Sequence, residues 1–289
     1  MRVLVLGATG HIGSAIADEL IANDHEVVAL ARSDASVAKL ANKSLCVIRG
    51  DLRAPDQWCG IVHEIDAVIH AAATFSEDMG EVDRHLVGAL IAHAKSADTK
   101  IRFIYTGGCW LYGKTGDRVA NEASSFNPLP AFKWMIENSR EVSAVPCFDT
   151  MIIHPAMTYD REGGAISRWL KSASEIGTLE VWGSLETRWP VVHREDLAHA
   201  YRLVLESGEA GQSYCASAQA GVRVGDMASA INRRFNLKTC PQVLTIEQVI
   251  TTHGKDALGP TLDQQMSGKK IIENLGWKPK YPDILSEIG

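Results

Sequence analysis

The sequence predicts an α/β fold with a doubly wound parallel sheet and a small interleaved C-terminal lobe. Short apolar segments alternate with segments of helical spacing through the first half of the chain, and the first of them runs into a glycine-rich turn. After about residue 150 this alternation loosens. Strands buried on both faces are short, continuous apolar runs. Their alternation with helices implies parallel strands joined by right-handed crossovers.

In the first half, helical spacing of apolar residues predicts a helix that ends near Asn23 and a longer one over Met79–Ala97. Five short apolar segments predict the strands of the sheet: Val3–Leu6, Glu26–Leu30, Leu45–Ile48, Ala67–His70 and Ile101–Tyr105.

The second half predicts fewer and more widely spaced elements. They are a strand at Thr150–Ile153, an irregular stretch with one helix over Tyr159–Gly183, a helix from Asp196 to about Glu206, a strand at Gln212–Ala216, and helices at Val224–Phe235 and Asp263–Leu275. Gly276 and Pro279 stop the last helix. We expect residues 1–155 to form one body and residues 156–289 to form mainly the lobe, interleaved with it as a single structural unit.

The composition is that of a globular protein without a nucleic-acid or membrane role. Hydrophobic residues make up 46% of the 289 residues, and the formal net charge is −6. No basic tract exceeds a pair, which disfavours binding to nucleic acids or anionic membranes, and no apolar run approaches the ~18 residues of a membrane span. The six cysteines include no Cys-x-x-Cys pair, so we expect free thiols and a cytoplasmic protein.

The glycine-rich turn is the strongest functional signal. A backbone without Cβ atoms can approach a pyrophosphate closely, and the N-terminus of the following helix offers free N–H groups and the positive end of a dipole. The strand before the turn and the helix after it are the context that such a motif requires. We therefore expect the turn to hold the pyrophosphate of a dinucleotide, through Gly7, Thr9, Gly10, His11, Ile12 and Gly13.

The residues after the second strand predict which dinucleotide binds. A site specific for NAD carries Asp or Glu there to hold the ribose 2′-hydroxyl. This chain has Arg32 and Ser33, a permanent cation and a hydroxyl that suit a 2′-phosphate. Asp34 lies one or two residues too late for the usual carboxylate, and it keeps NAD as the alternative. We expect NADP(H) to be preferred over NAD(H), unless Arg32 is only a solvated charge at a strand end.

With these motifs the chain resembles the extended or atypical short-chain dehydrogenases/reductases, the epimerase/dehydratase-like group. The resemblance covers nearly the whole length and implies that residues 1–155 are a Rossmann-type, dinucleotide-binding body and that the lobe mainly binds substrate. It rests on the order and spacing of Gly7–Gly13, Gly50–Leu52, His70–Ala73, Tyr105–Gly108, Tyr112–Gly113, Ile153–Pro155, Val192–Ala198 and Leu275–Pro279.

The resemblance implies further cofactor contacts. Asp51, followed by Leu52, stands where the family places a carboxylate against the adenine. His154 stands where many relatives carry an Arg, and the alternative to a cofactor contact is a buried structural histidine. The segment after the fourth strand has small side chains that let the backbone pass the nicotinamide-side ribose: Ala71, Ala72 and Ala73.

The catalytic pattern of the family is broken in this chain. That pattern needs a Ser or Thr after the fifth strand and a Tyr four residues before a Lys, where the Tyr exchanges a proton with the substrate and the Lys lowers the Tyr pKa. Here the Ser position is Gly108, the Tyr position is Leu129 and the Lys is Lys133, while no tyrosine lies between Tyr112 and Tyr159.

A few residues remain as candidates for the chemistry. Lys133 would hold the nicotinamide ribose. Tyr112 is the nearest phenol to the vacated site, although packing against the sheet end is its alternative role, and Thr106 and Cys109 are lesser candidates. The proton could instead come from water or from an acidic group of the substrate, since hydride transfer depends mostly on proximity and orientation.

An aromatic-rich set of residues predicts a flat, apolar or aromatic substrate. Core packing is the alternative for Trp134 and Trp189, and Arg188 is the one nearby cation for an acidic substrate group. The expected substrate contacts are Cys109, Trp110, Tyr112, Tyr159, Arg188 and Trp189, with Trp134 and Trp182 in the same set.

The sequence therefore predicts an NADP(H)-dependent reductase acting on a carbonyl or similar unsaturated group of a small aromatic molecule. The alternatives are an NADP(H)-binding redox sensor without turnover and a non-redox isomerase or dehydratase on the same scaffold. No metal motif occurs among the ten histidines, and Asp196 is expected to be an N-terminal helix carboxylate. Other than a small-molecule substrate, we expect no partner except a second copy, by analogy with such folds.

Overall fold

The computed structural model describes residues 1–289, apart from the side chain of residue 256, and confirms the predicted α/β class. Its main sheet has seven strands, whose neighbouring pairs from β3 to β6 are all parallel. In spatial order they are β11 (Ser213–Ala216), β6 (Phe148–Pro155), β5 (Ile101–Thr106), β4 (Ala67–His70), β1 (Arg2–Leu6), β2 (Glu26–Ala31) and β3 (Cys46–Arg49).

The order of the strands reverses between β1 and β4. From β1 the chain winds outward through β2 to β3, and it then returns to β4 on the other side of β1 and winds outward through β5 to β6. The predicted first-half strands match these strands to within a residue or two. In open α/β sheets the ligand crevice lies outside the carboxyl ends of the strands at such a switch point, so this edge is where a site is expected.

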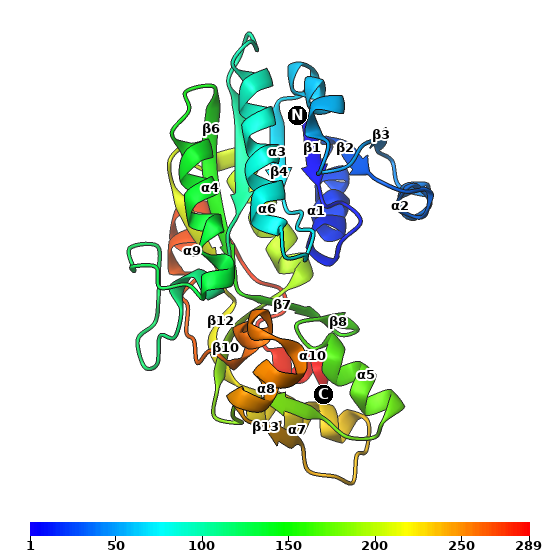
Figure 1. Ribbon diagram of the computed structural model, residues 1–289, viewed down its shortest axis with the longest axis vertical. Coiled ribbons are helices and arrows are strands. Elements are labelled where there is room, and N and C mark those ends of the chain that lie inside the picture. The colour runs from blue at the N-terminus through cyan, green and yellow to red at the C-terminus, as the bar shows by residue number, and fades with distance from the viewer. The chain divides into compact units, whose positions relative to one another are not determined.

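Successive side chains of a strand point to opposite faces of the sheet, and different helices cover the two faces. On β5, Phe103 and Tyr105 join the core that contains the buried face of α3 (Met79–Ala94). Arg102 and Thr106 point the other way and bond to α6 (Arg194–Ser207) or the residue after it. Figure 1 shows α3 side by side with α4 (Trp134–Ser143).

The chain folds into two compact units. Unit 1 comprises residues 1–107, 134–153 and 197–214, and unit 2 comprises residues 108–133, 154–196 and 215–289. Unit 1 also contains α1 (His11–Ala22) and α2 (Asp34–Leu40). The strands of unit 2 are β7 (Met157–Asp160), β8 (Gly163–Gly164), β9 (Glu180–Trp182), β10 (Arg188–His193), β12 (Gln219–Arg223) and β13 (Gln242–Leu244).

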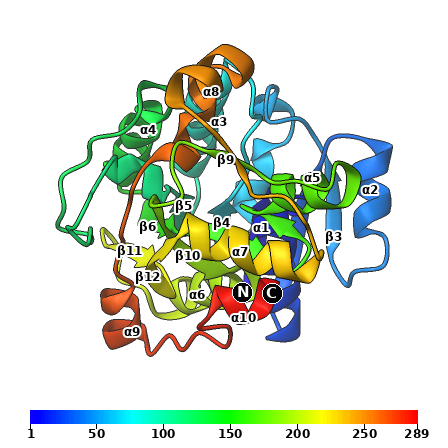
Figure 2. The ribbon, with the colours of Figure 1, turned by 90° about the horizontal axis from the view of Figure 1, so that it is seen from below.

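The helices of unit 2 complete its architecture. In Figure 2, α7 and α10 lie side by side, and both pack within this unit. The helices are α5 (Ser167–Glu175), α7 (Val224–Arg234), α8 (Ile246–His253), α9 (Lys269–Leu275) and α10 (Ile284–Ile288).

The helix predicted over Asp263–Leu275 is wrong in its first half, since α9 begins only at Lys269. The residues before it are extended and bond to other segments: Gln264 N–H donates to the carbonyl of Arg188 at 2.9 Å, and Met266 N–H donates to that of Ala220 at 2.9 Å. Apolar spacing alone cannot distinguish such a strap from a helical turn, because the partners of the strap lie tens of residues away.

Asp196 occupies the first turn of α6, but its carboxylate does not cap that helix. Its Oδ1 accepts a hydrogen bond from Lys280 N–H at 2.7 Å, and its Oδ2 accepts one from Tyr281 N–H at 2.9 Å. Its backbone carbonyl accepts from Trp277 Nε1 at 2.9 Å. Asp196 is therefore the expected carboxylate in the first turn of a helix, and it also anchors the C-terminal segment of unit 2.

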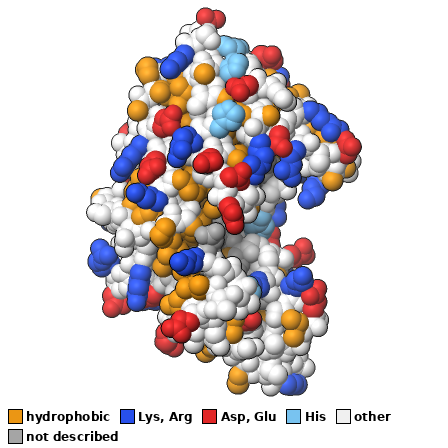
Figure 3. All heavy atoms as spheres, in the orientation of Figure 1, with side chains coloured by type: hydrophobic (Ala, Val, Ile, Leu, Met, Phe, Trp, Pro, Cys, Tyr) orange, Lys and Arg blue, Asp and Glu red, His pale blue; other side chains and the backbone are white. Residues whose placement is uncertain are grey.

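The surface carries charges of both signs, and the cysteines are unpaired. On the face drawn in Figure 3, basic and acidic side chains are interspersed. None of the helices in the described part of the chain is both long and apolar enough to cross a membrane. All six cysteines are free thiols, and among the described side chains no group of three or more His, Cys, Asp or Glu residues could hold a metal ion.

Candidate functional site

The glycine-rich turn leaves the N-terminus of α1 open to an anion. Gly7 follows β1 with φ of +93°, a conformation that favours glycine, and Gly10 N–H donates to its carbonyl at 2.8 Å. Gly10 is the N-cap of α1, where no side chain accepts from the helix and no acid occupies the first turn. The N-cap residue of this twelve-residue helix thus makes no side-chain cap hydrogen bond to the first turn, which is the arrangement used by anion sites at helix N-termini.

Backbone contacts hold this turn against the end of β4. A Cβ atom on Gly7 would lie 2.6 Å from the carbonyl oxygen of Ala71, and one on Gly13 would collide with the carbonyl of Gly7. Ala71 N–H also donates to the carbonyl of Leu6 at 3.1 Å. These residues fit the pyrophosphate of a dinucleotide, because the turn, the helix start and the alanine segment meet without side chains between them.

The end of β2 presents an exposed cation, and the nearby carboxylate of Asp34 forms an ion pair with another residue. Arg32 is 70% exposed, and its Nε lies 3.9 Å from Asp51 Oδ2, which is a loose ion pair. Asp34, the first residue of α2, is paired with Arg49 at the end of β3. That hydrogen bond lowers the pKa of Asp34. Ser33 is the N-cap of α2, where its Oγ accepts from Ser36 N–H at 3.2 Å.

The other residues expected near the adenine and the nicotinamide keep their predicted places along the chain. Asp51 follows β3, and its Oδ1 accepts from Arg53 N–H at 2.9 Å. Thr106 ends β5, with its Oγ1 2.6 Å from the hydroxyl of Tyr201. Lys133 is exposed and directly precedes α4. Leu52, Ala72 and Ala73 lie in the loops after β3 and β4, as expected.

The two vacated catalytic positions differ in their surroundings. A Cβ atom on Gly108 would meet nothing within 4 Å, so the missing Ser is not excluded by crowding. Leu129 has extended backbone and precedes Pro130, which starts a short 3-10 turn that ends at Lys133. The Tyr position is therefore not on the helix that follows Lys133.

Tyr112 is buried inside unit 2 and already has a partner. Its hydroxyl lies 3.2 Å from Cys215 Sγ, and its ring contacts Phe126 and His154 with centroids 5.2 and 5.5 Å apart. Burial, followed by the neighbouring Cys215, raises the pKa of Tyr112 far above its usual value. This environment favours the packing role over proton donation.

We expect Tyr112→Phe to change turnover by less than about 3-fold, because a buried, neutral phenol at this pKa is a poor proton donor. The loss of the contact with Cys215 should cost about 1 kcal/mol of stability. The rate of NADPH oxidation and the thermal midpoint of the variant measure the two effects. A decrease in turnover of about 100-fold or more at unchanged stability would restore Tyr112 to the catalytic residues.

His154 is buried in unit 2 beside Tyr112 and Phe126, and its Nδ1 has no hydrogen-bond partner among the described atoms. Burial lowers its pKa to about 4, from 6.5. This placement favours the structural histidine over a cofactor contact. Because the unfolded chain binds a proton between these two values and the folded chain does not, His154 destabilises the fold as the pH falls through this window.

We expect wild-type protein to lose about 2 kcal/mol more stability than His154→Phe between about pH 7 and about pH 5. Phenylalanine keeps the ring contacts with Tyr112 and Phe126 and removes the titration. Urea unfolding of both proteins at the two pH values measures the difference. Equal losses for the two proteins would show that His154 does not titrate below its ordinary range in the fold.

The residues expected to contact substrate are mostly packed against other side chains of unit 2. The ring of Trp189 stacks on Trp169 at 5.2 Å and its Nε1 donates to the carbonyl of Pro260 at 2.9 Å. Tyr159 is buried, with its ring 5.4 Å from that of His193, and its hydroxyl has no hydrogen-bond partner among the described atoms. These placements support the core-packing alternative for Trp189. The ring of Tyr159 is likewise packed inside unit 2.

The remaining members of the aromatic set are divided between the two units. Trp110 is half-buried in unit 2 and contacts Phe132 with ring centroids 4.9 Å apart. Cys109 is buried, and burial raises its pKa to about 12, so it is no thiolate. Trp182 lies in unit 2 under the guanidinium of Arg168 at 3.9 Å. Trp134, in unit 1, packs on Gly80.

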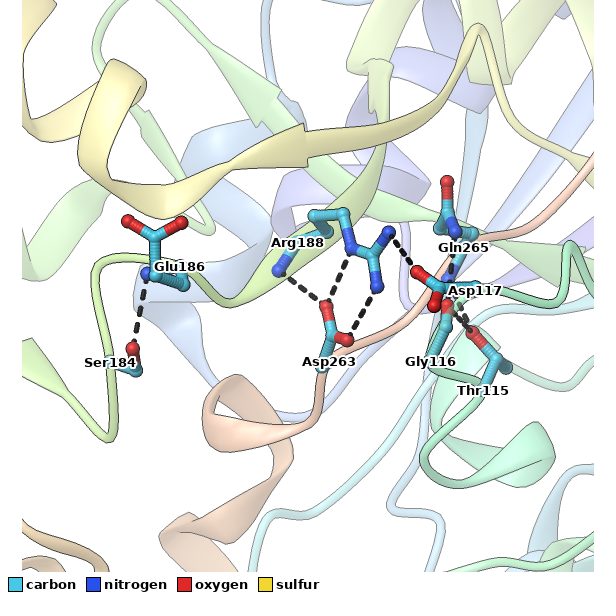
Figure 4. A network of polar contacts seen from close by, with 8 residues as sticks. All are labelled: Thr115, Gly116, Asp117, Ser184, Glu186, Arg188, Asp263 and Gln265. Atoms are coloured by element: carbon cyan, nitrogen blue, oxygen red, sulfur yellow. Dashed lines mark hydrogen bonds and ion pairs between the residues drawn. The ribbon is translucent and has the colours of Figure 1, made fainter.

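Arg188 is not a free cation for a substrate. Figure 4 shows its guanidinium between two carboxylates: Nε and Nη2 donate to Asp263 at 2.9 and 2.7 Å, and Nη1 donates to Asp117 at 3.0 Å. These hydrogen bonds raise the pKa of Arg188. The predicted anchoring of an acidic substrate is therefore corrected, because Arg188 ties the strap before α9 to β10 and to the loop at Asp117.

The sequence analysis missed a buried polar network in unit 1. Asp83 of α3 accepts hydrogen bonds from His70, Tyr105 and Asn138 at 2.6, 2.8 and 2.7 Å. The one sequence feature that could have indicated a buried carboxylate is the helical spacing of Asp83 with the apolar residues Leu86 and Leu90. The partners could not be identified, because they come from three other elements.

Comparison with known proteins supports the family and the fold. The model of the NAD dependent epimerase/dehydratase family matches residues 3–216. An uncharacterized protein of Saccharomyces cerevisiae is 29% identical over 299 residues, which span 100% of this chain and 98% of that protein.

Two solved structures illustrate the shared fold. A dTDP-glucose 4,6-dehydratase from Streptomyces venezuelae with NAD and TYD bound is similar with a TM-score of 0.83 and 21% identity, over 100% of this chain and 94% of that one. A human epimerase family protein with NADPH is similar with a TM-score of 0.80 and 18% identity, over 100% of this chain and 98% of that one.

The match to the family model extends from β1, through the glycine-rich turn, to the last strand of the main sheet. That stretch contains all seven strands and the turn that fits a dinucleotide pyrophosphate. The chain therefore belongs to the NAD dependent epimerase/dehydratase family and has its Rossmann-type, NAD(P)-binding scaffold.

Proposed function

We propose that this protein is an NADP(H)-preferring oxidoreductase that reduces a carbonyl or similar unsaturated group of a small aromatic molecule. The observation that carries the cofactor preference is the end of β2, where Arg32 is exposed while the nearby carboxylate of Asp34 is paired with Arg49. A 2′-phosphate needs a cation and a ribose 2′-hydroxyl needs a free carboxylate, and this segment offers the first.

Each of the predicted cofactor-binding residues has a distinct task in this proposal. The turn at Gly7 and Gly10 and the start of α1 bind the pyrophosphate. Arg32 and the N-cap hydroxyl of Ser33 bind the 2′-phosphate, and Lys133 holds the nicotinamide ribose. When bound, NADPH supplies a hydride, and the chain contributes orientation and exclusion of water.

The proton for the reduced product comes from water or from the substrate in this proposal. Tyr112 is buried with a partner and is a poor proton donor, and the Ser and Tyr positions hold Gly108 and Leu129, whose side chains have no acidic proton. The aromatic substrate is proposed because several rings of unit 2 keep exposed or half-buried surface, among them Trp110, Phe126 and Phe132.

The test is NADPH oxidation over a panel of aromatic and aliphatic carbonyl compounds, with NADH in parallel and with Lys133→Ala as the variant control. We expect oxidation with at least one aromatic member, faster with NADPH, and a loss in Lys133→Ala of about 10-fold or more. Tight binding of NADPH without hydride transfer across the panel would overturn the enzymatic role in favour of the sensor. Product formation without net oxidation of NADPH would favour the isomerase or dehydratase.

A further inference from the structure

A single buried carboxylate in unit 1 joins three separate elements. Asp83 is 6% exposed on α3, and its Oδ1 lies 2.6 Å from Nε2 of His70 on β4. Its Oδ2 accepts from the hydroxyl of Tyr105 on β5 at 2.8 Å and from Nδ2 of Asn138 on α4 at 2.7 Å. Asn138 also reaches the carbonyl of Gly80 on α3 at 3.3 Å.

The three donors to Asp83 are close in sequence to residues that we expect at the nicotinamide. His70 is the last residue of β4 and is followed by the alanine segment that begins at Ala71. Tyr105 lies one residue before the end of β5, which leads to Gly108. Asn138 belongs to the helix that starts directly after Lys133. One carboxylate thus ties together the ends of β4 and β5 and the middle of α4.

The three polar contacts favour the ionised form of Asp83. Burial acts to raise the pKa of Asp83, but the charge of His70 and the hydrogen bonds from His70, Asn138 and Tyr105 lower it overall. His70 Nδ1 has no hydrogen-bond partner among the described atoms.

Stability alone does not account for this network. Apolar residues of the same shape are often as stabilising as a buried ionic group, and here Asn138 Oδ1 is also left without a partner. Removing one member of such a network, by contrast, releases the elements that it holds. Its place at the carboxyl ends of β4 and β5, next to the switch point, is where a ligand is expected.

We propose that Asp83 is a positioning residue for the nicotinamide half of the cofactor. It fixes the spacing between the alanine segment after β4, the end of β5 and α4, and it touches neither the cofactor nor the substrate. The adenine half is bound by the glycine-rich turn and by the end of β2, which share no residue with the network. This inference rests on the proposed binding of NADP(H).

The test compares two ligands that differ in the nicotinamide half. Calorimetric titration of wild type and Asp83→Asn is carried out with NADP+ and with 2′,5′-ADP, which contains only the adenine end. Asparagine keeps the shape but places an N–H₂ group among three donors. We expect the affinity for NADP+ to fall by about 10-fold and that for 2′,5′-ADP by less than about 2-fold. Equal losses for the two ligands, or no loss, would overturn the inference.

Two further variants keep the test decisive. Tyr105→Phe removes one donor and keeps the ring, and we expect a smaller loss, about 3-fold, again confined to NADP+. If Asp83→Asn does not fold, this variant decides the matter. Thr150→Val is the matched control, because it deletes a buried hydrogen bond to the carbonyl of Val142 at the far end of α4. It should lower the thermal midpoint and leave the ratio of the two affinities unchanged.

Failure of this inference differs from failure of the proposed function. Wild-type protein that binds neither NADP+ nor 2′,5′-ADP overturns the proposed cofactor, and with it the basis of the inference. Wild-type protein that binds both, together with Asp83→Asn and Tyr105→Phe variants whose affinity ratio is unchanged, overturns the positioning role alone.

Discussion

Gly13→Ala is expected to weaken NADPH binding by about 100-fold or more. The new methyl group would collide with the carbonyl and the carbonyl carbon of Gly7. Those atoms belong to the backbone, so no side chain can rotate away, and Gly7 is itself held against the end of β4. The turn would have to open, and the N–H groups at the start of α1 would no longer point together toward the pyrophosphate. Calorimetric titration with NADPH measures the loss.

Gly88→Ala is the matched control for this substitution. Gly88 also lies in a helix of unit 1, within α3, but a Cβ atom there would meet nothing within 4 Å. Alanine should stabilise that helix by about 0.5–1 kcal/mol and leave the affinity for NADPH unchanged. A Gly13→Ala protein that folds and binds NADPH like the wild type would remove the glycine-rich turn from the cofactor site.

Arg32→Ala is expected to reduce the affinity for NADPH by about 10- to 30-fold at low ionic strength and that for NADH by less than about 2-fold. The guanidinium is exposed and only loosely paired with Asp51, so its interaction with a 2′-phosphate is strong enough to select the cofactor but sensitive to screening. The selectivity should therefore shrink as salt is added. Titrations with both nucleotides at two salt concentrations measure it.

Lys39→Ala provides the control for charge in this experiment. Lys39 is an exposed cation on α2, close in sequence to Arg32 and with the same formal charge. Its removal changes the net charge equally and should leave the ratio of the NADPH and NADH affinities as it is. If Arg32→Ala weakened both nucleotides to the same extent, Arg32 would be a solvated charge and the preference for NADP(H) would have to be withdrawn.

The parts of the fold that the sequence predicted well are local. The strand, turn and helix around Gly7, Gly10 and Gly13 are consecutive, so their residue types alone determine how they connect. The parallel strands are continuous apolar runs, and their alternation with helices leaves few possible topologies. The exposed cation at Arg32 was predicted from one position after β2, although its pairing with Asp51 and that of Asp34 with Arg49 were not.

The parts that the sequence could not predict depend on pairing across the chain. Arg188 meets Asp263, 75 residues away, and the segment around Asp263 pairs as an extended strap, so its helical spacing was misleading. Asp83 meets partners 13, 22 and 55 residues away. From the sequence alone, each of these charged side chains could equally be exposed to solvent. Only the fold shows that the carboxylate of Asp83 is buried and that the cation of Arg188 is neutralised.

The central claim is that this chain binds a dinucleotide and selects it by its 2′-phosphate. It is tested most directly by calorimetric titration of the cofactor-stripped protein with NADPH, NADP+, NADH and NAD+ in parallel. The account predicts binding of all four through the glycine-rich turn, about 10-fold or more tighter for the two phosphorylated forms. Binding of none of the four would contradict the cofactor site, and equal or tighter binding of NADH and NAD+ would contradict the role of Arg32.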